Sequence, residues 1–291
     1  MFQIAPAIFL RRSSISGRMI PLDTIFSREN SVVKHVRKLK IKKYRQKNNQ
    51  FMIEGVRFVK EALISDAPIR YCLCSAVFSS DEDVRKLLDD ILKKGIKIYI
   101  VDENLLKDIC DTETPQGIVA VIDRVGYDIN QLIKESDLIV IVDRIQDPGN
   151  LGTIIRTADA AGAKGVILSE GTVDVYNPKV LRSTMGSIFH IPVAMTSDLI
   201  DAVEKLKKQG FTIYASSLEG SIAYYDEAYT GKTAIIIGNE AQGIESSLML
   251  RSDKLIKIPM HGLAESLNAA VAAGIILFEV VKKKLKNIKV N

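Results

Sequence analysis

The second half of the chain contains short runs of apolar residues, each followed by polar residues and turn formers. Uninterrupted apolar runs of this length are typical of strands that are buried on both faces of a parallel sheet. Apolar residues at helical spacing lie between several of these runs. The pattern predicts strands at 138–142, 165–168, 191–194, 211–215, 233–237 and 255–258, and helices at 150–161, 198–209 and 266–286. We therefore expect an α/β domain with a parallel sheet and helices on both faces.

The first half also alternates between the two periodicities, but on a smaller scale. Its pattern predicts helices at 30–47, 56–64, 81–94 and 103–110, and strands at 51–53, 69–75, 96–101 and 117–122. This alternation indicates a second, smaller α/β domain. The two domains are expected at 22–122 and 138–291, joined by a polar linker at 123–137 that lacks periodicity. Residues 1–21 are expected to be a disordered extension, or to include a segment before a natural start at Met19.

Composition narrows the class of protein. A hydrophobic fraction of 47% and a charged fraction of 26% are typical of a globular protein with a substantial core. The three cysteines, Cys72, Cys74 and Cys110, form no disulfide framework, which favours a reducing compartment. No apolar run is long enough to span a membrane. We expect a cytoplasmic protein, and we expect no metal because no cysteine and histidine cluster has ligand spacing.

A dense basic stretch lies near the start of the first domain, with Tyr44 among the charges. A run of charges is most simply a solvated face, but this density favours contact with nucleic-acid phosphates. The modest net charge of +5 permits such a partner without requiring one. The residues expected to make these phosphate contacts are Lys34, Arg37, Lys38, Lys42, Lys43 and Arg45.

Three segments of the second domain place polar groups directly after predicted strands. They are residues 143–156, 237–244 and 258–270. Parallel strands end at one edge of their sheet, where ligands bind in such folds, so we expect the three segments to converge there. Taken singly, each segment could be an ordinary strand-to-helix turn.

Each segment has local features that suit a ligand site. Asn150 is expected to cap the helix that follows it, and Arg156 lies on the polar side of that helix. Gly238 and a second glycine flank a loop whose backbone could approach a ligand closely. Ser266 precedes a helix that starts with Asn268 and is rich in small residues; its simplest role is that of a helix cap.

In their order and residue identities, the three segments resemble the signature motifs of the SpoU/TrmH family of the SPOUT superfamily. The matching positions include Asn-Leu-Gly followed by Arg156, Gly-Asn-Glu at 238–240, and Ile-Pro-Met at 258–260 followed by Ser-Leu-Asn at 266–268. The stretch 27–62 resembles the family's accessory RNA-binding domain, which is similar to a ribosomal-protein fold. The resemblance covers residues 22–285.

This resemblance implies an RNA 2′-O-methyltransferase that uses S-adenosylmethionine, works as a homodimer through its catalytic domain, and carries a deep trefoil knot. Its implied functional positions are Asn150, Arg156, Glu240, Ser266 and Asn268. Its implied donor-binding positions are Gly238, Asn239, Ile258, Met260 and Leu267, and Arg182 joins the residues expected to contact RNA.

Within this scheme, the charge of each side chain limits the chemistry that it can perform. A guanidinium stays protonated in proteins, so Arg156 is expected to stabilise the developing alkoxide and to orient a phosphate, and not to remove a proton. Ser266 and Asn268 would hold the hydroxyl and the donor. Glu240 would fix either Arg156 or the loop.

The extra N-terminal domain favours ribosomal RNA as the substrate, by analogy. A transfer RNA substrate stays open, as does a non-catalytic protein for RNA binding or ribosome assembly on the same fold. A different nucleotide-dependent enzyme is a third alternative.

Overall fold

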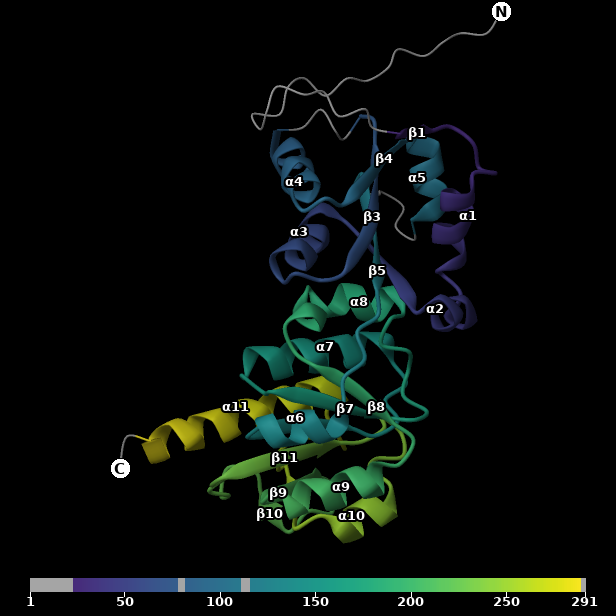
Figure 1. Cartoon of the computed structure of the whole chain (residues 1–291). Helices are drawn as coiled ribbons and strands as arrows, with labels where there is room; N and C mark the ends of the chain where they lie inside the picture. The colour runs from purple at the N-terminus through teal and green to yellow at the C-terminus, as the bar shows by residue number, and fades with distance from the viewer. Residues whose placement is uncertain (1–22, 78–81, 111–115, 289–291) are drawn as a thin grey trace, which may run out of the picture. The chain divides into compact units, whose positions relative to one another are not determined.

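The computed structural model describes residues 23–77, 82–110 and 116–288, and it divides into two compact units between Arg124 and Val125 (Figure 1). We call residues 1–124 the N-terminal unit and residues 125–291 the C-terminal unit. The extension expected at 1–21 lies outside the described residues. No helix of the described part has the length and hydropathy that crossing a membrane requires.

The N-terminal unit contains a five-stranded mixed sheet with the order β1-β4-β3-β5-β2. β1 and β3 both pair with β4 in parallel, whereas β5 runs antiparallel to its neighbours β3 and β2. The strands are β1 (Asp23–Ile25), β2 (Gln50–Glu54), β3 (Ile69–Ser75), β4 (Lys97–Val101) and β5 (Ile118–Asp123).

Helices cover both faces of this sheet. α1 and α5 bury apolar side chains such as Val33, Val36 and Leu106 in one core, together with Leu73 of β3. α3 and α4 pack against each other and against strands. The helices are α1 (Ser31–Lys38), α2 (Lys42–Asn48), α3 (Val56–Ile64), α4 (Glu82–Lys93) and α5 (Glu103–Ile109).

The single helix predicted at 30–47 is wrong, because the chain turns between α1 and α2. The guanidinium of Arg45 donates from Nη1 to the carbonyl oxygens of Leu39 (2.8 Å) and Lys40 (2.7 Å) in that turn. Carbonyls at a helix end need such partners. Arg45 is only 3% exposed, so the expectation that it contacts RNA is also wrong.

The C-terminal unit contains a seven-stranded sheet with the order β10-β12-β9-β11-β6-β7-β8. Every neighbouring pair in it is parallel, as the continuous apolar runs predicted. The strands are β6 (Leu138–Val142), β7 (Gly165–Ser169), β8 (Val193–Thr196), β9 (Phe211–Ser216), β10 (Ile222–Ala223), β11 (Lys232–Ile237) and β12 (Lys254–Lys257). The trefoil knot implied by the resemblance stays a prediction.

Helices lie on both faces of this sheet as well. α6, α9 and α10 share one apolar core with alternate residues of β6 and β11, and α7 packs against α8 and α11 on the other side. The helices are α6 (Ile129–Glu135), α7 (Pro148–Ala160), α8 (Pro178–Thr184), α9 (Leu199–Lys208), α10 (Ser246–Arg251) and α11 (Ala269–Ile288). α6 lies inside the segment 123–137, which we predicted to be a polar linker without periodicity. Its buried residues Leu132 and Ile133 form too short a pattern to be recognised.

Small residues set the close contacts of α7. A Cβ on Gly152 would lie 2.4 Å from the Ser183 Cβ and 2.5 Å from the Val180 carbonyl oxygen, so α8 approaches the α7 backbone directly. On α11, Ala270 and Ala273 are buried and the helix contacts α7 and β11. The small residues of α11 therefore serve, at least in part, to pack it within its own unit.

Candidate active site

The first predicted segment forms the turn between β6 and α7. Asp147 caps α7 by accepting a hydrogen bond from the Asn150 backbone N–H (2.8 Å), and Pro148 occupies the first turn. Our expectation that Asn150 is the cap is therefore wrong. Because Asp147 satisfies the helix end, the Asn150 side chain is available for other contacts.

Arg156 lies on the exposed side of α7, opposite the buried stripe of Leu151, Ile154 and Ile155. This is the side that the sequence pattern predicted. Within the described residues, nothing accepts a hydrogen bond or forms an ion pair with its guanidinium. Its two-pronged donor surface is thus not used by the fold itself.

The second segment is a tight loop after β11. The Asn239 backbone N–H donates to the Gly243 carbonyl (3.1 Å), and the Gly243 N–H returns a bond to the Asn239 carbonyl (2.9 Å). A Cβ on Gly238 would lie 2.4 Å from the Gly243 carbonyl carbon and the Ile244 nitrogen. Gly238 is therefore required by close backbone approach within the loop itself.

Glu240 joins this loop to the first segment. Its carboxylate accepts hydrogen bonds from the backbone N–H groups of Gln146 and Asp147 (both 3.1 Å) and from the Asn150 amide Nδ2 (2.9 Å). Partial burial raises the pKa of Glu240, but these hydrogen bonds outweigh it and the pKa lies below its ordinary value. Of the two roles expected for Glu240, the geometry supports fixing the loop, since Arg156 is not among its partners.

Asn268 links the third segment to the same cluster. Its amide Nδ2 donates to Asn150 Oδ1 (2.7 Å), and its Oδ1 accepts from the backbone N–H groups of Ala270 (2.9 Å) and Val271 (3.2 Å). Asn268 therefore caps α11, and the simple role of helix cap that we considered for Ser266 falls to Asn268. We call Glu240, Asn150 and Asn268 the amide–carboxylate chain, because it connects all three predicted segments.

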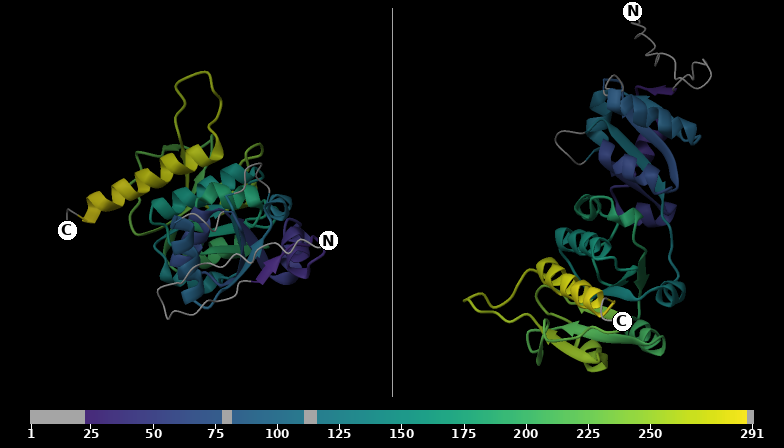
Figure 2. Two further views of the ribbon diagram at one scale, coloured as in Figure 1. Left: turned by 90° about the horizontal axis from the view of Figure 1, so that it is seen from above. Right: turned by 90° about the vertical axis from the view of Figure 1, so that its left-hand side faces the viewer.

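The rest of the third segment contrasts with this chain. Residues 258–267 make no hydrogen bonds to any described residue, and Ser266 and Leu267 are exposed. Both views in Figure 2 show the chain between β12 and α11 running out as a long loop. Backbone groups without intramolecular partners need water, a ligand or another chain. Ile258 and Met260, at the start of this loop, are half-buried.

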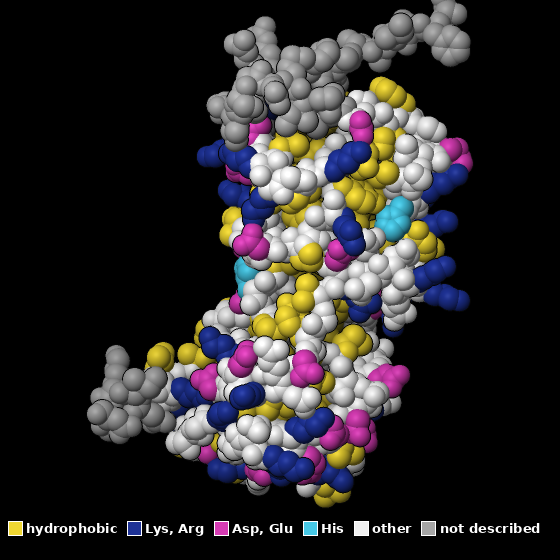
Figure 3. All heavy atoms as spheres, viewed as in Figure 1, with side chains coloured by type: hydrophobic (Ala, Val, Ile, Leu, Met, Phe, Trp, Pro, Cys, Tyr) yellow, Lys and Arg dark blue, Asp and Glu magenta, His cyan; other side chains and the backbone are white. Residues whose placement is uncertain are grey.

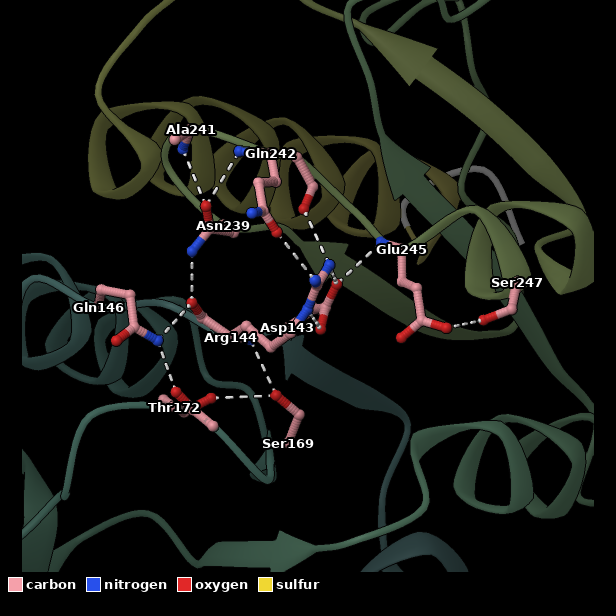
Figure 4. A network of polar contacts seen from close by, with 12 residues as sticks. Asp143, Arg144, Gln146, Ser169, Thr172, Asn239, Ala241, Gln242, Glu245 and Ser247 are labelled. Carbon is pink, nitrogen blue, oxygen red and sulfur yellow. Dashed lines mark hydrogen bonds and ion pairs between the residues drawn. The ribbon is translucent and has the colours of Figure 1, made fainter.

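A second polar cluster, which the sequence interpretation did not single out, lies on the other side of the Gly238–Gly243 loop. Arg144 is its centre, between Asn239 and Ser169 (Figure 4). The Asn239 amide Nδ2 donates to the Arg144 carbonyl (2.7 Å), while Asn239 Oδ1 accepts from two N–H groups of its own loop. A charged pair directly after an all-apolar strand is the signal that could have identified this cluster.

The basic residues predicted to contact RNA fall into two groups. Lys34, Lys38, Lys42 and Lys43 are exposed, and Lys and Arg side chains gather over α1 and α2 in Figure 3. Arg37 is different, because its Nε and Nη2 atoms are buried. We call the four lysines the α1–α2 lysine surface. Arg182 is exposed on α8 in the C-terminal unit.

No group of His, Cys, Asp or Glu side chains in the described residues is arranged to hold a metal ion. The cysteines Cys72 and Cys74 are buried in β3, and burial raises the pKa of each thiol to about 12. Such thiols are inert as nucleophiles. Among the described residues, the chemistry therefore centres on amide, carboxylate and guanidinium groups.

Two family models match separate parts of the chain. Residues 137–278 match the model of the SpoU rRNA Methylase family, and residues 30–120 match that of the MRM3-like substrate binding domain. A 23S rRNA (guanosine(2553)-2′-O)-methyltransferase from Bacillus subtilis is 39% identical over 88% of this chain and 98% of its own length.

Solved structures with the same fold span both units. An AdoMet-bound rRNA methyltransferase from Sinorhizobium meliloti matches with a TM-score of 0.82 and 33% identity, covering 90% of this chain and 98% of that one. The SpoU methyltransferase AviRb from Streptomyces viridochromogenes, in complex with AdoMet, matches with a TM-score of 0.79 and 30% identity over 88% of this chain and 99% of its own.

Proposed function

This chain belongs to the SpoU rRNA methylase family, and we propose that it transfers a methyl group from S-adenosylmethionine to a ribose 2′-hydroxyl of ribosomal RNA. The observation that carries the proposal is the amide–carboxylate chain. It joins the three loops to which we assign the chemistry. Asn150 Nδ2 donates to the Glu240 carboxylate (2.9 Å) and Asn268 Nδ2 donates to Asn150 Oδ1 (2.7 Å), so the three loops form one polar surface.

The residues present fit a methyl donor. A donor of this class offers an adenine edge and an amino acid, which backbone N–H and C=O groups can recognise, and the unpaired backbone groups of residues 258–267 are such partners. The tight packing of Gly238 on Gly243 leaves no room for a side chain at position 238. We assign donor binding to Gly238, Asn239, Ile258, Met260 and Leu267.

When bound, S-adenosylmethionine supplies a methyl group on a positively charged sulfur, which is already strongly electrophilic. The protein then has to hold the ribose hydroxyl in line and to stabilise the charge that develops on its oxygen. We assign that stabilisation to Arg156, whose guanidinium forms no hydrogen bond or ion pair with any described residue. Asn268, fixed at both ends of its amide, would help to orient the site, and Ser266 would contact the hydroxyl.

A homodimer through the C-terminal unit is part of this proposal. Val271, Phe278 and Leu285 are 51%, 52% and 56% exposed, and they follow one another at intervals of seven residues on α11. This interval keeps them on one side of a helix. An exposed apolar stripe of this kind favours contact with another protein surface. A second subunit would also offer partners to the open loop at 258–267.

We assign RNA binding to the α1–α2 lysine surface, supported by the match of residues 30–120 to a substrate-binding domain, and to Arg182. Ribosomal RNA is favoured over transfer RNA because the Bacillus subtilis and Sinorhizobium meliloti relatives, which match along nearly the whole chain, are named as rRNA methyltransferases. With that substrate, we place the protein in the cytoplasm. Replacing Lys42 and Lys43 together by alanine should reduce RNA affinity and flatten its dependence on salt.

The test is ribose-methylation mapping of ribosomal RNA from cells that lack this gene, before and after treatment with purified protein and methyl donor. We expect one or a few 2′-O-methyl groups to be restored by the wild type. Arg156→Lys should restore them about 10²-fold more slowly, since it loses the planar donor pair. Methylation of transfer RNA alone would assign that substrate instead, and donor binding without methylation of either RNA would contradict the proposal.

A further inference from the structure

We propose that the Asp143–Arg144 pair is a positioning device for the donor-binding loop, acting through the backbone of Gly238–Gly243. The inference rests on the proposed function of that loop. Neither residue belongs to the amide–carboxylate chain, and neither is assigned a contact with donor or RNA. Their role follows from what they bind within the protein.

Asp143 is a nearly fully buried carboxylate, 1% exposed, at the end of β6. Its two oxygens accept a two-pronged pair of hydrogen bonds from Arg144 Nε and Nη2, both at 2.8 Å. One of them also accepts from the Glu245 backbone N–H at 2.9 Å, just beyond the loop. A buried carboxylate is stable only with such partners, so Asp143 depends on Arg144.

Arg144 also contacts the loop directly. Its Nη1 donates to the Gln242 side chain (3.2 Å) and its Nη2 lies 3.5 Å from the Gly243 carbonyl oxygen. The Arg144 carbonyl accepts from Asn239 Nδ2 (2.7 Å). Three of the six residues of the loop are thus held by one arginine.

The backbone of Arg144 adopts a conformation that is energetically unfavourable for a residue with a side chain. Its φ is +54°, in the left-handed region that a side-chain-bearing residue adopts at a disadvantage. The Arg144 N–H donates to Ser169 Oγ (2.8 Å) at the end of β7, which fixes that conformation. Glycine would adopt this φ more readily, so the arginine side chain contributes something that offsets the strain.

The Gly238–Gly243 loop is therefore held on two sides. Glu240 ties it to the start of α7, and the Asp143–Arg144 pair ties it to the ends of β6 and β7. Removing the pair should let the loop backbone shift around Asn239, Gln242 and Gly243, while Glu240 keeps its own hydrogen bonds to the start of α7. The expected effect is weaker donor binding, with the chemical step changed much less.

The test compares Arg144→Gly with Arg144→Lys. Arg144→Gly keeps the backbone conformation but leaves the buried Asp143 carboxylate unpaired by a guanidinium. We expect its donor dissociation constant, measured by calorimetry without RNA, and its KM for the donor to rise by about tenfold or more, with kcat within about threefold. Arg144→Lys retains the charge without the fork and should recover part of the affinity.

Asp66→Gly is the matched control. Asp66 also has a positive φ, of 52°, and also pairs with a cation, Lys94, but it lies in the N-terminal unit. It should leave donor affinity unchanged. If Arg144→Gly does not fold, Arg144→Asn, which tolerates the left-handed region, takes its place.

The outcomes separate the two proposals. Wild-type protein that fails to bind the donor would refute the proposed function of the loop. Wild-type binding together with unchanged donor affinity in Arg144→Gly, or a loss confined to kcat, would overturn the role of the Asp143–Arg144 pair alone.

Discussion

Two parts of the candidate active site differ in how far the protein itself has completed them. The loops after β6 and β11 are closed by hydrogen bonds: Glu240 accepts three of them, and the Asp143–Arg144 pair adds more. The loop at 258–267 makes none with the described residues, and its neighbour on α11 is an exposed apolar stripe. We infer that the first part is preorganised by the fold, and that the second is completed by ligand and partner.

This contrast has a chemical reason. Positioning a hydroxyl for in-line attack requires groups that stay fixed when the reaction proceeds, and amide and carboxylate groups with satisfied hydrogen bonds meet that need. The loop at 258–267 is the other part of the proposed donor site, and it has no hydrogen bonds to described residues that donor exchange would have to break.

Two glycines test the contrast most strongly. Gly238→Ala places a Cβ 2.4 Å from backbone atoms of Gly243 and Ile244, which cannot move aside as a flexible side chain would. We expect a loss of about 1–3 kcal/mol in the free energy of unfolding and donor binding too weak to measure by calorimetry.

The matched variant is Gly262→Ala in the open loop, where a Cβ would meet nothing within 4 Å. It should change the donor dissociation constant by less than about twofold, which corresponds to less than about 1 kcal/mol. The free energy of unfolding should also change by less than about 1 kcal/mol. Equal effects of the two substitutions would remove the distinction between a closed and an open region.

Glu240→Ala should have the next largest effect. Three donors, the N–H groups of Gln146 and Asp147 and the Asn150 amide, lose their acceptor together. Displacing Asn150 by a fraction of an ångström to an ångström is expected to lower kcat/KM by about 10²-fold. Methyl-transfer rates with labelled donor measure this directly.

Glu240→Gln serves as the control, because it retains one acceptor oxygen and the size of the side chain. It should lose less activity than Glu240→Ala. The same loss in both variants would mean that the negative charge, and not the hydrogen bonding of the loop, is what matters.

Phe278→Glu tests whether the exposed apolar stripe of α11 is the proposed dimer interface. A charge in the exposed stripe of α11 should weaken self-association by about tenfold or more and reduce methyl transfer in proportion to the dimer lost. Sedimentation at several protein concentrations, paired with activity at the same concentrations, measures both.

Leu250→Glu is the control for this substitution. Leu250 is 85% exposed on α10, against 52% for Phe278, and its replacement adds the same charge to the same unit. It should leave the oligomeric state unchanged. A Phe278→Glu protein that stays dimeric would show that the stripe is not the interface.

The smallest expected effect concerns pH. The pKa of Glu240 lies below its ordinary value of 4.5 in the folded protein, so its ionised form contributes stability above that pH. This contribution should be lost as the pH falls from 4.5 through the lower folded pKa. Because Glu240 is exposed to solvent, the change is small.

Urea unfolding at a series of pH values between neutral and acid conditions measures this contribution. The wild type should lose stability more steeply below pH 4.5 than Glu240→Gln, which has no carboxyl group to titrate at this position. Parallel curves for the two proteins would show that the hydrogen bonds to Glu240 do not favour its charged form.

Much of the fold was predictable from the chain alone. The apolar runs predicted every long strand of the parallel sheet, because a strand buried on both faces admits few polar residues. The stripe of Leu151, Ile154 and Ile155 likewise predicted which side of α7 exposes Arg156. Short helices such as α6 and α10 were missed, since they bury only two residues and one residue, respectively, which is too few to define a period.

What the sequence by itself determined is the class of fold, the three segments and their family resemblance, because periodicity and turn chemistry are local. Only the tertiary structure decided which groups satisfy one another. It assigned the helix caps to Asp147 and Asn268, buried Arg45 under carbonyl oxygens, and gave Glu240 the β6–α7 turn as its partner. Which of these hydrogen bonds form depends on how segments that are far apart in the sequence fold together. Local sequence patterns therefore do not specify them.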